Sequence, residues 1–134
     1  SGLRAQLFAG SNFERPAHED VHARLEHRWG RGAPHRTVEA DAFSIRWTGY
    51  FLAPRSGTYR LKLSADDAAS VWLNDRFLLR GNAEVGVTLV AGLNPLRIEL
   101  SETGGDAHLD LQWQPPDTAE YRAIPPEALA HDAE

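Results

Sequence analysis

The chain has 134 residues, of which 42% are hydrophobic and 25% are charged, the composition of one ordinary globular domain. Its formal net charge of −5 argues against nucleic acid as a partner. No apolar run approaches the ~20 residues of a membrane span, and the absence of cysteine excludes disulfides, zinc–thiolate sites and thiol catalysis. We expect one domain over residues 1–134, monomeric in isolation and cut from a larger protein, since Ser1-Gly2 resembles a remnant of cloning.

The first third of the chain has little regular patterning. After the short apolar segment at residues 2–8, residues 9–36 show no period of two, and they hold four of the six histidines. We expect this third to be irregular. The only helix candidates in the chain are residues 18–28 and a short turn at residues 126–130.

From residue 43 onward, apolar and polar residues alternate with a period of two, which predicts half-buried β-strands. Gly49 interrupts the first of these strands, and a β-bulge or a bend is the structure that such a glycine favours. Asn74-Asp75 has the composition of a hairpin turn, with residues 77–80 as the returning strand. Short strands separated by turns predict an all-β fold, an antiparallel β-barrel or β-sandwich.

The phase of the alternation predicts which side chains face the core, because residues two apart on a strand share one face. Arg46, Lys62 and Arg97 fall on the opposite phase and should face outward. The expected inner face consists of Phe43, Ile45, Trp47, Tyr59, Leu61, Leu63, Leu96, Ile98, Leu100, Leu109, Leu111 and Trp113.

One segment matches the His-Glu-x-x-His pattern of zinc proteases, with His18, Glu19 and His22 in the defining positions. On a helix, the two histidines would share one face, with Glu19 placed to activate a zinc-bound water. A zincin helix packs under a preceding sheet, however, and only seventeen residues precede His18. No third ligand follows in the expected position. We therefore interpret the segment as a charged loop that binds no catalytic zinc.

Other catalytic patterns give no support for an enzyme. No serine lies in a Gly-x-Ser-x-Gly elbow, and Gly104-Gly105 is too short for a phosphate loop. Nineteen acidic residues offer many carboxylate pairs, but nothing in the sequence selects one pair as a glycosidase site. We expect a protein that is not an enzyme.

Asp66-Asp67 stands at the end of a predicted strand and is the most informative acidic pair. Calcium takes roughly six to eight oxygen ligands, mostly carboxylates and carbonyls. Adjacent carboxylates of an extended strand point to opposite faces, so both reach one ion only if the backbone kinks, for example at a cis peptide. The alternative is a solvated turn in which one aspartate caps the loop backbone. The dipeptide alone leaves both interpretations open.

A series of landmarks covers nearly the whole chain in the order of one known family. The most specific is the strand FSIRWTGY, followed by Gly-Thr-Tyr and then Asp-Asp, within residues 41–75. The others are GLRAQLF at residues 2–8, WGRGAP at 29–34, VTLVAGLNPLRIEL at 87–100, LDLQW at 109–113 and IPPEAL at 124–129. By these landmarks the chain resembles the protective-antigen-type (PA14) domain, a β-barrel module of yeast flocculins, epithelial adhesins and bacterial glycosidases.

This resemblance implies a calcium site at Asp66 and Asp67. In family members that bind sugars, two aspartates at this position are joined by a cis peptide and hold calcium, which binds sugar hydroxyls. A loop between the last two long strands completes the coordination, and here that loop is residues 101–108. The implied metal ligands are Asp66, Asp67, Asp106, Thr103, Gly104 and Gly105.

The sugar-contact candidates are Asp66, Asp67, Glu102, Asp106, Trp72 and His108. Asp106 has an alternative role as an ordinary acid of a hairpin loop, and Trp72 has one as a packing residue beneath a loop. The loop is shorter than that of the yeast adhesins, so their sugar preference does not transfer.

The function implied is a non-catalytic, calcium-dependent carbohydrate-binding module whose partner is a glycan with vicinal hydroxyls. We expect it to belong to a larger exported protein, at the cell surface, in the medium or in the periplasm, without direct membrane insertion. The alternative is a structural or protein-interaction domain of a secreted or membrane-anchored enzyme, in which any calcium serves stability only. An ion with open coordination in an exposed cleft would favour the first function.

Overall fold

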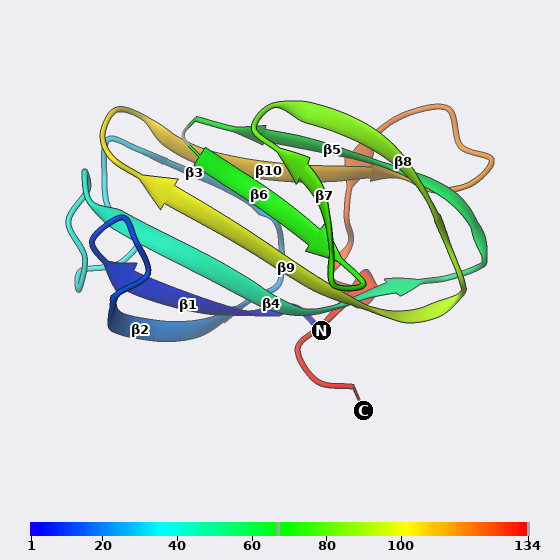
Figure 1. The fold of residues 1–134 in the computed structure, drawn as a ribbon, viewed down its shortest axis with the longest axis horizontal. Helices are drawn as coiled ribbons and strands as arrows, with labels where there is room; N and C mark the ends of the chain where they lie inside the picture. The colour runs from blue at the N-terminus through cyan, green and yellow to red at the C-terminus, as the bar shows by residue number, and fades with distance from the viewer. Residues whose placement is uncertain (67, 134) are drawn as a thin grey trace.

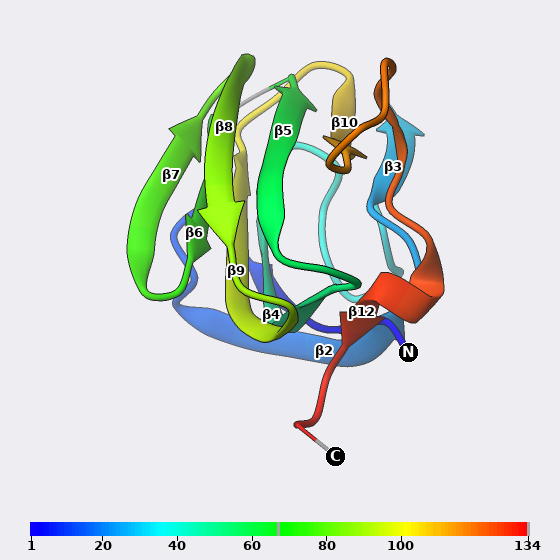
Figure 2. The same cartoon turned by 90° about the vertical axis from the view of Figure 1, so that its right-hand side faces the viewer.

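Two antiparallel sheets pack face to face in the computed structural model, which describes residues 1–66 and 68–133 (Figures 1 and 2). The larger sheet runs in the order β2 (Arg15–His22), β1 (Leu3–Ala9), β4 (Phe43–Ala53), β9 (Gly92–Glu102), β6 (Ala68–Leu73) and β7 (Arg76–Arg80), with β12 (Leu129–Ala130) also paired to β4. The smaller sheet runs β11 (Arg122–Ala123), β10 (Ala107–Gln114), β5 (Gly57–Ala65) and β8 (Ala83–Leu89), with β3 (Glu26–Gly30) also paired to β10. The all-β prediction is therefore confirmed, in the form of a sandwich.

The predicted phase of the strands is confirmed. All twelve residues assigned to the inner face are buried, and Phe43, Ile45, Trp47, Tyr59 and Ile98 are fully inaccessible to solvent. Lys62 and Arg97 are exposed and Arg46 is half-buried, as their opposite phase requires. The two inner faces together form one continuous apolar core.

The hairpin predicted at Asn74-Asp75 is also confirmed. Both residues have positive φ, 54° and 62°, as the two central residues of a type I′ turn require. The turn joins β6 to β7, which returns over Arg76–Arg80, one residue earlier than the expected residues 77–80.

Gly49 has a different role from the predicted bulge or bend. β4 pairs with β9 without a register shift from Phe43 to Ala53. A Cβ on Gly49 would lie 2.2 Å from the carbonyl oxygen of Ala130, and the glycine φ is +153°. The glycine therefore makes room for the backbone of β12, which lies beside β4.

The first third of the chain is more regular than the sequence predicted, and the helix expected at residues 18–28 is wrong. β2 and β3 occupy this region, each at an edge of a sheet. Neither edge strand contributes a deeply buried face, so the apolar alternation that marks a strand in sequence is missing. The turn expected at residues 126–130 exists as a short 3₁₀ helix, Pro126–Ala128, which leads into β12.

Gly2 and β12, near the two ends of the described chain, lie close together (Figures 1 and 2). The amide of Gly2 donates to the carbonyl oxygen of Leu129 across a distance of 2.9 Å. Among the described residues, no helix has the length and hydropathy of a membrane span.

Replacing Gly49 with alanine should destabilise the domain by more than about 2 kcal/mol, because the new Cβ would collide with backbone and the φ value would be strained. The measurement is urea unfolding followed by tryptophan fluorescence. Gly86→Ala is the matched control, since the nearest atom to its Cβ is the flexible Nη1 of Arg60 at 3.3 Å. Equal loss of stability in both variants would contradict this account of Gly49.

Candidate functional site

The candidate site lies at the end of the sandwich where two chain connections meet, at the left in Figure 1. One connection follows β5 and the other joins β9 to β10. β5 and β10 are paired with Leu109 opposite Ala65, so the two connections emerge side by side. The amide of Asp66 donates to the carbonyl oxygen of His108 at 3.3 Å, which extends the pairing by one residue.

Asn82 anchors the last residue of β5. Its side-chain amide donates to the carbonyl oxygen of Ala65 at 3.1 Å, and its side-chain oxygen accepts from the amide of Ala65 at 3.1 Å. This double hydrogen bond holds the backbone immediately before Asp66, which limits where the aspartate can point.

The carboxylate of Asp66 lies near Gly105 of the opposite loop. A Cβ on Gly105 would lie 3.6 Å from Oδ2 of Asp66, so any side chain at this position would touch the carboxylate. Gly104 and Gly105 have φ values of +147° and +85°, which side chains other than that of glycine rarely allow. The loop thus brings bare backbone against an exposed carboxylate.

Asp67 lies outside the described residues, and so does its peptide bond with Asp66. The predicted cis peptide and the convergence of the two carboxylates stay predictions.

Asp106 is on the same loop but points its carboxylate at Arg31. Nε of Arg31 and Oδ1 of Asp106 are 3.6 Å apart, and the two side chains are 87% and 72% exposed. An ion pair this exposed contributes little free energy, so Asp106 could leave it for another cation at small cost. Thr103 is exposed and Gly104 half-exposed on the same loop.

Glu102 and His108 occupy less open positions than the predicted sugar contacts would require. The side chain of Glu102 is completely buried, on the same strand face as Leu100. This placement does not favour direct contact with a sugar. His108 is half-buried, with Nε2 at 3.3 Å from the hydroxyl of Ser64.

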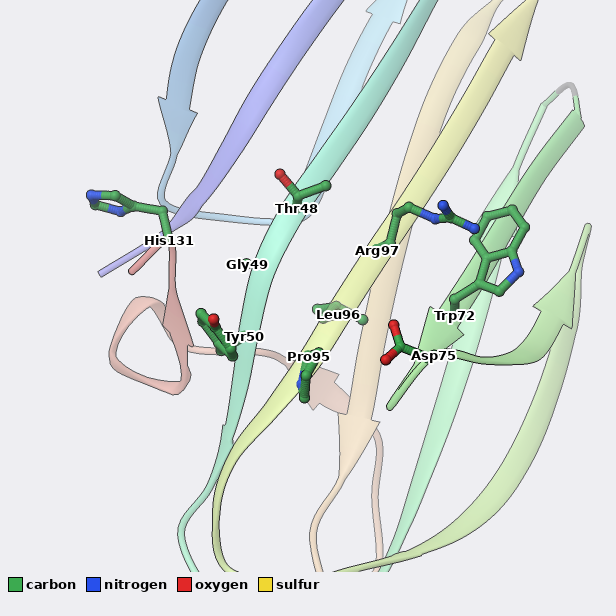
Figure 3. A pocket seen from close by; sticks show the side chains of 9 residues that line it. All are labelled: Thr48, Gly49, Tyr50, Trp72, Asp75, Pro95, Leu96, Arg97 and His131. Carbon is green, nitrogen blue, oxygen red and sulfur yellow. The ribbon is translucent and has the colours of Figure 1, made fainter. Parts of the chain in front are cut away.

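Trp72 lies away from this loop end. It is four residues along β6 from Ala68, or ~13 Å along the strand, and it lines a cavity on the outer face of the larger sheet (Figure 3). Its phase opposite to Val71 and Leu73 is confirmed, because both neighbours are buried and Trp72 is half-buried. The structure therefore does not bring it together with Asp66.

The oxygen donors present on the two connections at the loop end are of a kind that suits calcium. They are the carboxylates of Asp66 and Asp106 and the backbone carbonyls of residues 103–105, which are hard oxygen ligands. Among the described residues, no three His, Cys, Asp or Glu side chains are grouped closely enough to hold a metal. A calcium site here would therefore depend on backbone oxygens and on Asp67.

The His-Glu-x-x-His segment lies on β2, where it cannot form the helical zinc site. Successive side chains of a strand alternate faces, so Glu19 points away from His18 and His22. Glu19 pairs with Arg4, at 3.4 Å between Oε1 and Nε. His18 stacks on His35 with ring centroids 3.7 Å apart. The three side chains of the motif thus do not converge on one point.

His27 is the most strongly perturbed histidine of this region. Its ring stacks on Trp29 and Trp47, with centroids 5.3 Å and 5.7 Å away, and lies 4.7 Å from the ring of His22. Burial of the ring, with a smaller contribution from His22, lowers the pKa of His27 to about 4. The pKa of His22 is also lowered by burial, and its Nδ1 accepts a 2.9 Å hydrogen bond from the indole of Trp47.

Acid should weaken the fold through His27. Its pKa is about 4 in the folded state against 6.5 ordinarily, so the unfolded chain binds more protons between these values. The free energy of unfolding should therefore fall as the pH drops from 6.5 toward 4, lowering the Tm by a few degrees. His27→Phe, which keeps a flat ring, should show a smaller drop in Tm between pH 7.5 and pH 5. Identical drops in both proteins would contradict the assignment to His27.

The chain is thus a β-sandwich with oxygen donors exposed on the loops at one end. The PA14 domain family matches residues 1–127, so the chain belongs to the PA14 domain family, as its sequence landmarks indicated.

The relatives include two kinds of protein. Anti-sigma-I factor RsgI3 of Acetivibrio thermocellus is 29% identical over 79 residues, which are 59% of this chain and 12% of that protein. An anti-sigma factor domain-containing protein from Clostridium clariflavum is 23% identical with a TM-score of 0.90, over 98% of this chain and 47% of that one. The PA14 sugar-binding domain of an RTX adhesin is 14% identical with a TM-score of 0.80, over 98% of both chains. The chain thus spans less than half of either anti-sigma protein.

Proposed function

We propose that this PA14 domain is a non-catalytic, calcium-dependent carbohydrate-binding module of a larger protein. The observation that carries the proposal is the placement of the Asp66 carboxylate against the bare backbone of Gly105. A calcium site needs carboxylate and carbonyl oxygens close together, and a glycine leaves its backbone carbonyl accessible beside the carboxylate. The likeness to a domain described as sugar-binding, over the whole length of both chains, supports a glycan as the ligand class.

In this proposal each part of the loop end has its own task. Asp66 and Asp67 supply carboxylate oxygens, and residues 103–105 supply carbonyl oxygens from the opposite side. Asp106 also binds the ion, after breaking its ion pair with Arg31. Breaking that pair costs little free energy because both side chains are exposed. Calcium bound there would offer positions for vicinal sugar hydroxyls. His108 lies at the rim, held by Ser64, where it would restrict which sugars approach.

The same proposal places the domain outside the cytoplasm. Calcium is abundant in extracellular fluids, and weak exposed sites with few carboxylates are typical of extracellular modules. The sugar-binding neighbour belongs to an adhesin, which is consistent with that location.

A second candidate is a structural or protein-interaction module. The observation that favours it is the similarity to anti-sigma factor proteins, at 29% identity to one and a TM-score of 0.90 to another. In that function the loop end contributes stability only, and a partner protein takes the place of the glycan.

Removing one carboxylate should test the calcium site, and glycan binding should then separate the two functions. Asp66→Asn and Asp67→Asn should each abolish calcium binding, because each removes a charged ligand from a site with few of them. In the wild-type protein, calcium should raise the Tm, since an ion that binds only the folded state stabilises it. The measurements are calcium titration calorimetry and thermal unfolding with calcium or with chelator.

Asp117→Asn is the matched control, because Asp117 is 89% exposed and pairs with Arg55, away from residues 103–106. A glycan array with calcium, with chelator and with the Asp67→Asn protein then tests the ligand. Glycan binding that is lost with chelator and in the variant supports the module. A Tm that calcium leaves unchanged, with no glycan bound, would refute the proposal and leave the structural function.

A further inference from the structure

The cavity lined by Trp72 lies on the outer face of the larger sheet, away from the loop end. Its volume is about 410 Å³, within the range of small-ligand sites. Tyr50 and His131 stand on one side of it, and Trp72 and Asp75 on the other, with Pro95 at the floor between them (Figure 3).

The register of three neighbouring strands builds this cavity. Thr48 of β4, Arg97 of β9 and Trp72 of β6 lie directly across from one another in one row. The next row places Tyr50 opposite Pro95. The ring of Pro95 is short and lies between the longer side chains of Tyr50 and Asp75. The second row is therefore hollow in the middle.

Arg97 gives the cavity a fixed positive charge. Its guanidinium carbon lies 4.1 Å from the centre of the Trp72 ring, so the charged group lies over an aromatic face. A guanidinium in this position keeps N–H groups that can donate two parallel hydrogen bonds to a carboxylate.

Arg97 is also available for a ligand, in contrast to its neighbour. Arg46, one row along the same sheet face, is held by Glu99 at 2.7 Å between Nε and Oε2. Arg97 makes no ion pair with any carboxylate of the residues that the structure describes. No carboxylate of the described residues therefore lies within ion-pair distance of its guanidinium.

We propose that this cavity is a second carbohydrate site, which binds the carboxylate of an acidic sugar, a uronic acid, through Arg97. The hydroxyls of Thr48 and Tyr50 line the same cavity and can exchange hydrogen bonds with sugar hydroxyls. Asp75 lines the cavity on the same side as Trp72, where its carboxylate can accept hydrogen bonds from sugar hydroxyls.

This inference rests on the proposed function for the class of ligand, since both concern carbohydrates. It does not involve calcium or the loop end. Binding to the cavity can therefore be tested in the presence of chelator, where calcium-dependent binding makes no contribution.

The test is titration of the domain in EDTA with the methyl glycosides of glucuronic acid and galacturonic acid. The methyl glycosides of glucose and galactose serve as neutral counterparts, and a sulfated methyl glucoside serves as an anion of different shape. Binding is followed by amide and indole chemical shifts, which report whether Trp72 is affected. Arg97→Gln removes the proposed donor. Arg60→Gln is the matched control, because it removes an exposed arginine from the smaller sheet.

At least one uronate should bind about tenfold or more tightly than its neutral counterpart and should shift the Trp72 indole signal. Arg97→Gln should abolish the preference for the uronate while keeping the wild-type Tm. Arg60→Gln should keep the preference for the uronate. No uronate binding up to about 50 mM, equal binding of neutral sugars, tighter binding of the sulfated sugar, or full binding by Arg97→Gln would each overturn the proposal. Because these titrations contain EDTA, failure here says nothing against the calcium site, and failure of the calcium site leaves this result intact.

Discussion

The pairing of β4 with β9 is the constraint on which the rest of the structure depends. The two strands run antiparallel over eleven residues each, from Phe43 opposite Glu102 to Ala53 opposite Gly92, without a shift in register. They lie in the middle of the larger sheet, with β1 on one side and β6 on the other. A slip of one residue would turn every core side chain of a strand outward. The apolar alternation of both strands therefore holds the register, and the register positions everything around it.

Both candidate sites follow from this pairing in different ways. The loop end exists because β9 leaves the larger sheet after Glu102 and crosses to β10, which lies next to β5. The cavity exists because the outward residues of β4, β9 and β6 line up in rows across the sheet. The same strands thus carry an oxygen-rich loop at one end and the cavity with Arg97 on the outer face. Substitutions at Asp66 and at Arg97 should consequently act independently, since the two sites share no described contact.

The family relationship is consistent with a conserved β-sandwich whose outward residues and loops differ between members. Identity to the adhesin domain is only 14%, yet the TM-score is 0.80 over nearly the whole of both chains. A sandwich tolerates such divergence because its strands need apolar residues of suitable size at alternate positions, and many residues meet that need. Loops and outward-facing residues carry no such requirement. The residues of both proposed sites, such as Asp66, Gly105 and Arg97, accordingly lie outside the apolar pattern of the core.

The sequence by itself determined the strands from residue 43 onward, their inward faces and the Asn74-Asp75 turn, because burial imposes a period of two and a tight turn requires particular residues. It also indicated the family and the acidic pair at residues 66–67. It did not show β2 and β3, because edge strands lack a deeply buried face and leave no apolar alternation. Only the tertiary structure decided that Gly49 makes room for Ala130, that Trp72 lies apart from Asp66, and that the guanidinium of Arg97 lies over the Trp72 ring. Each of these facts depends on which strands become neighbours, and a pattern along one segment carries no information about its neighbours in space.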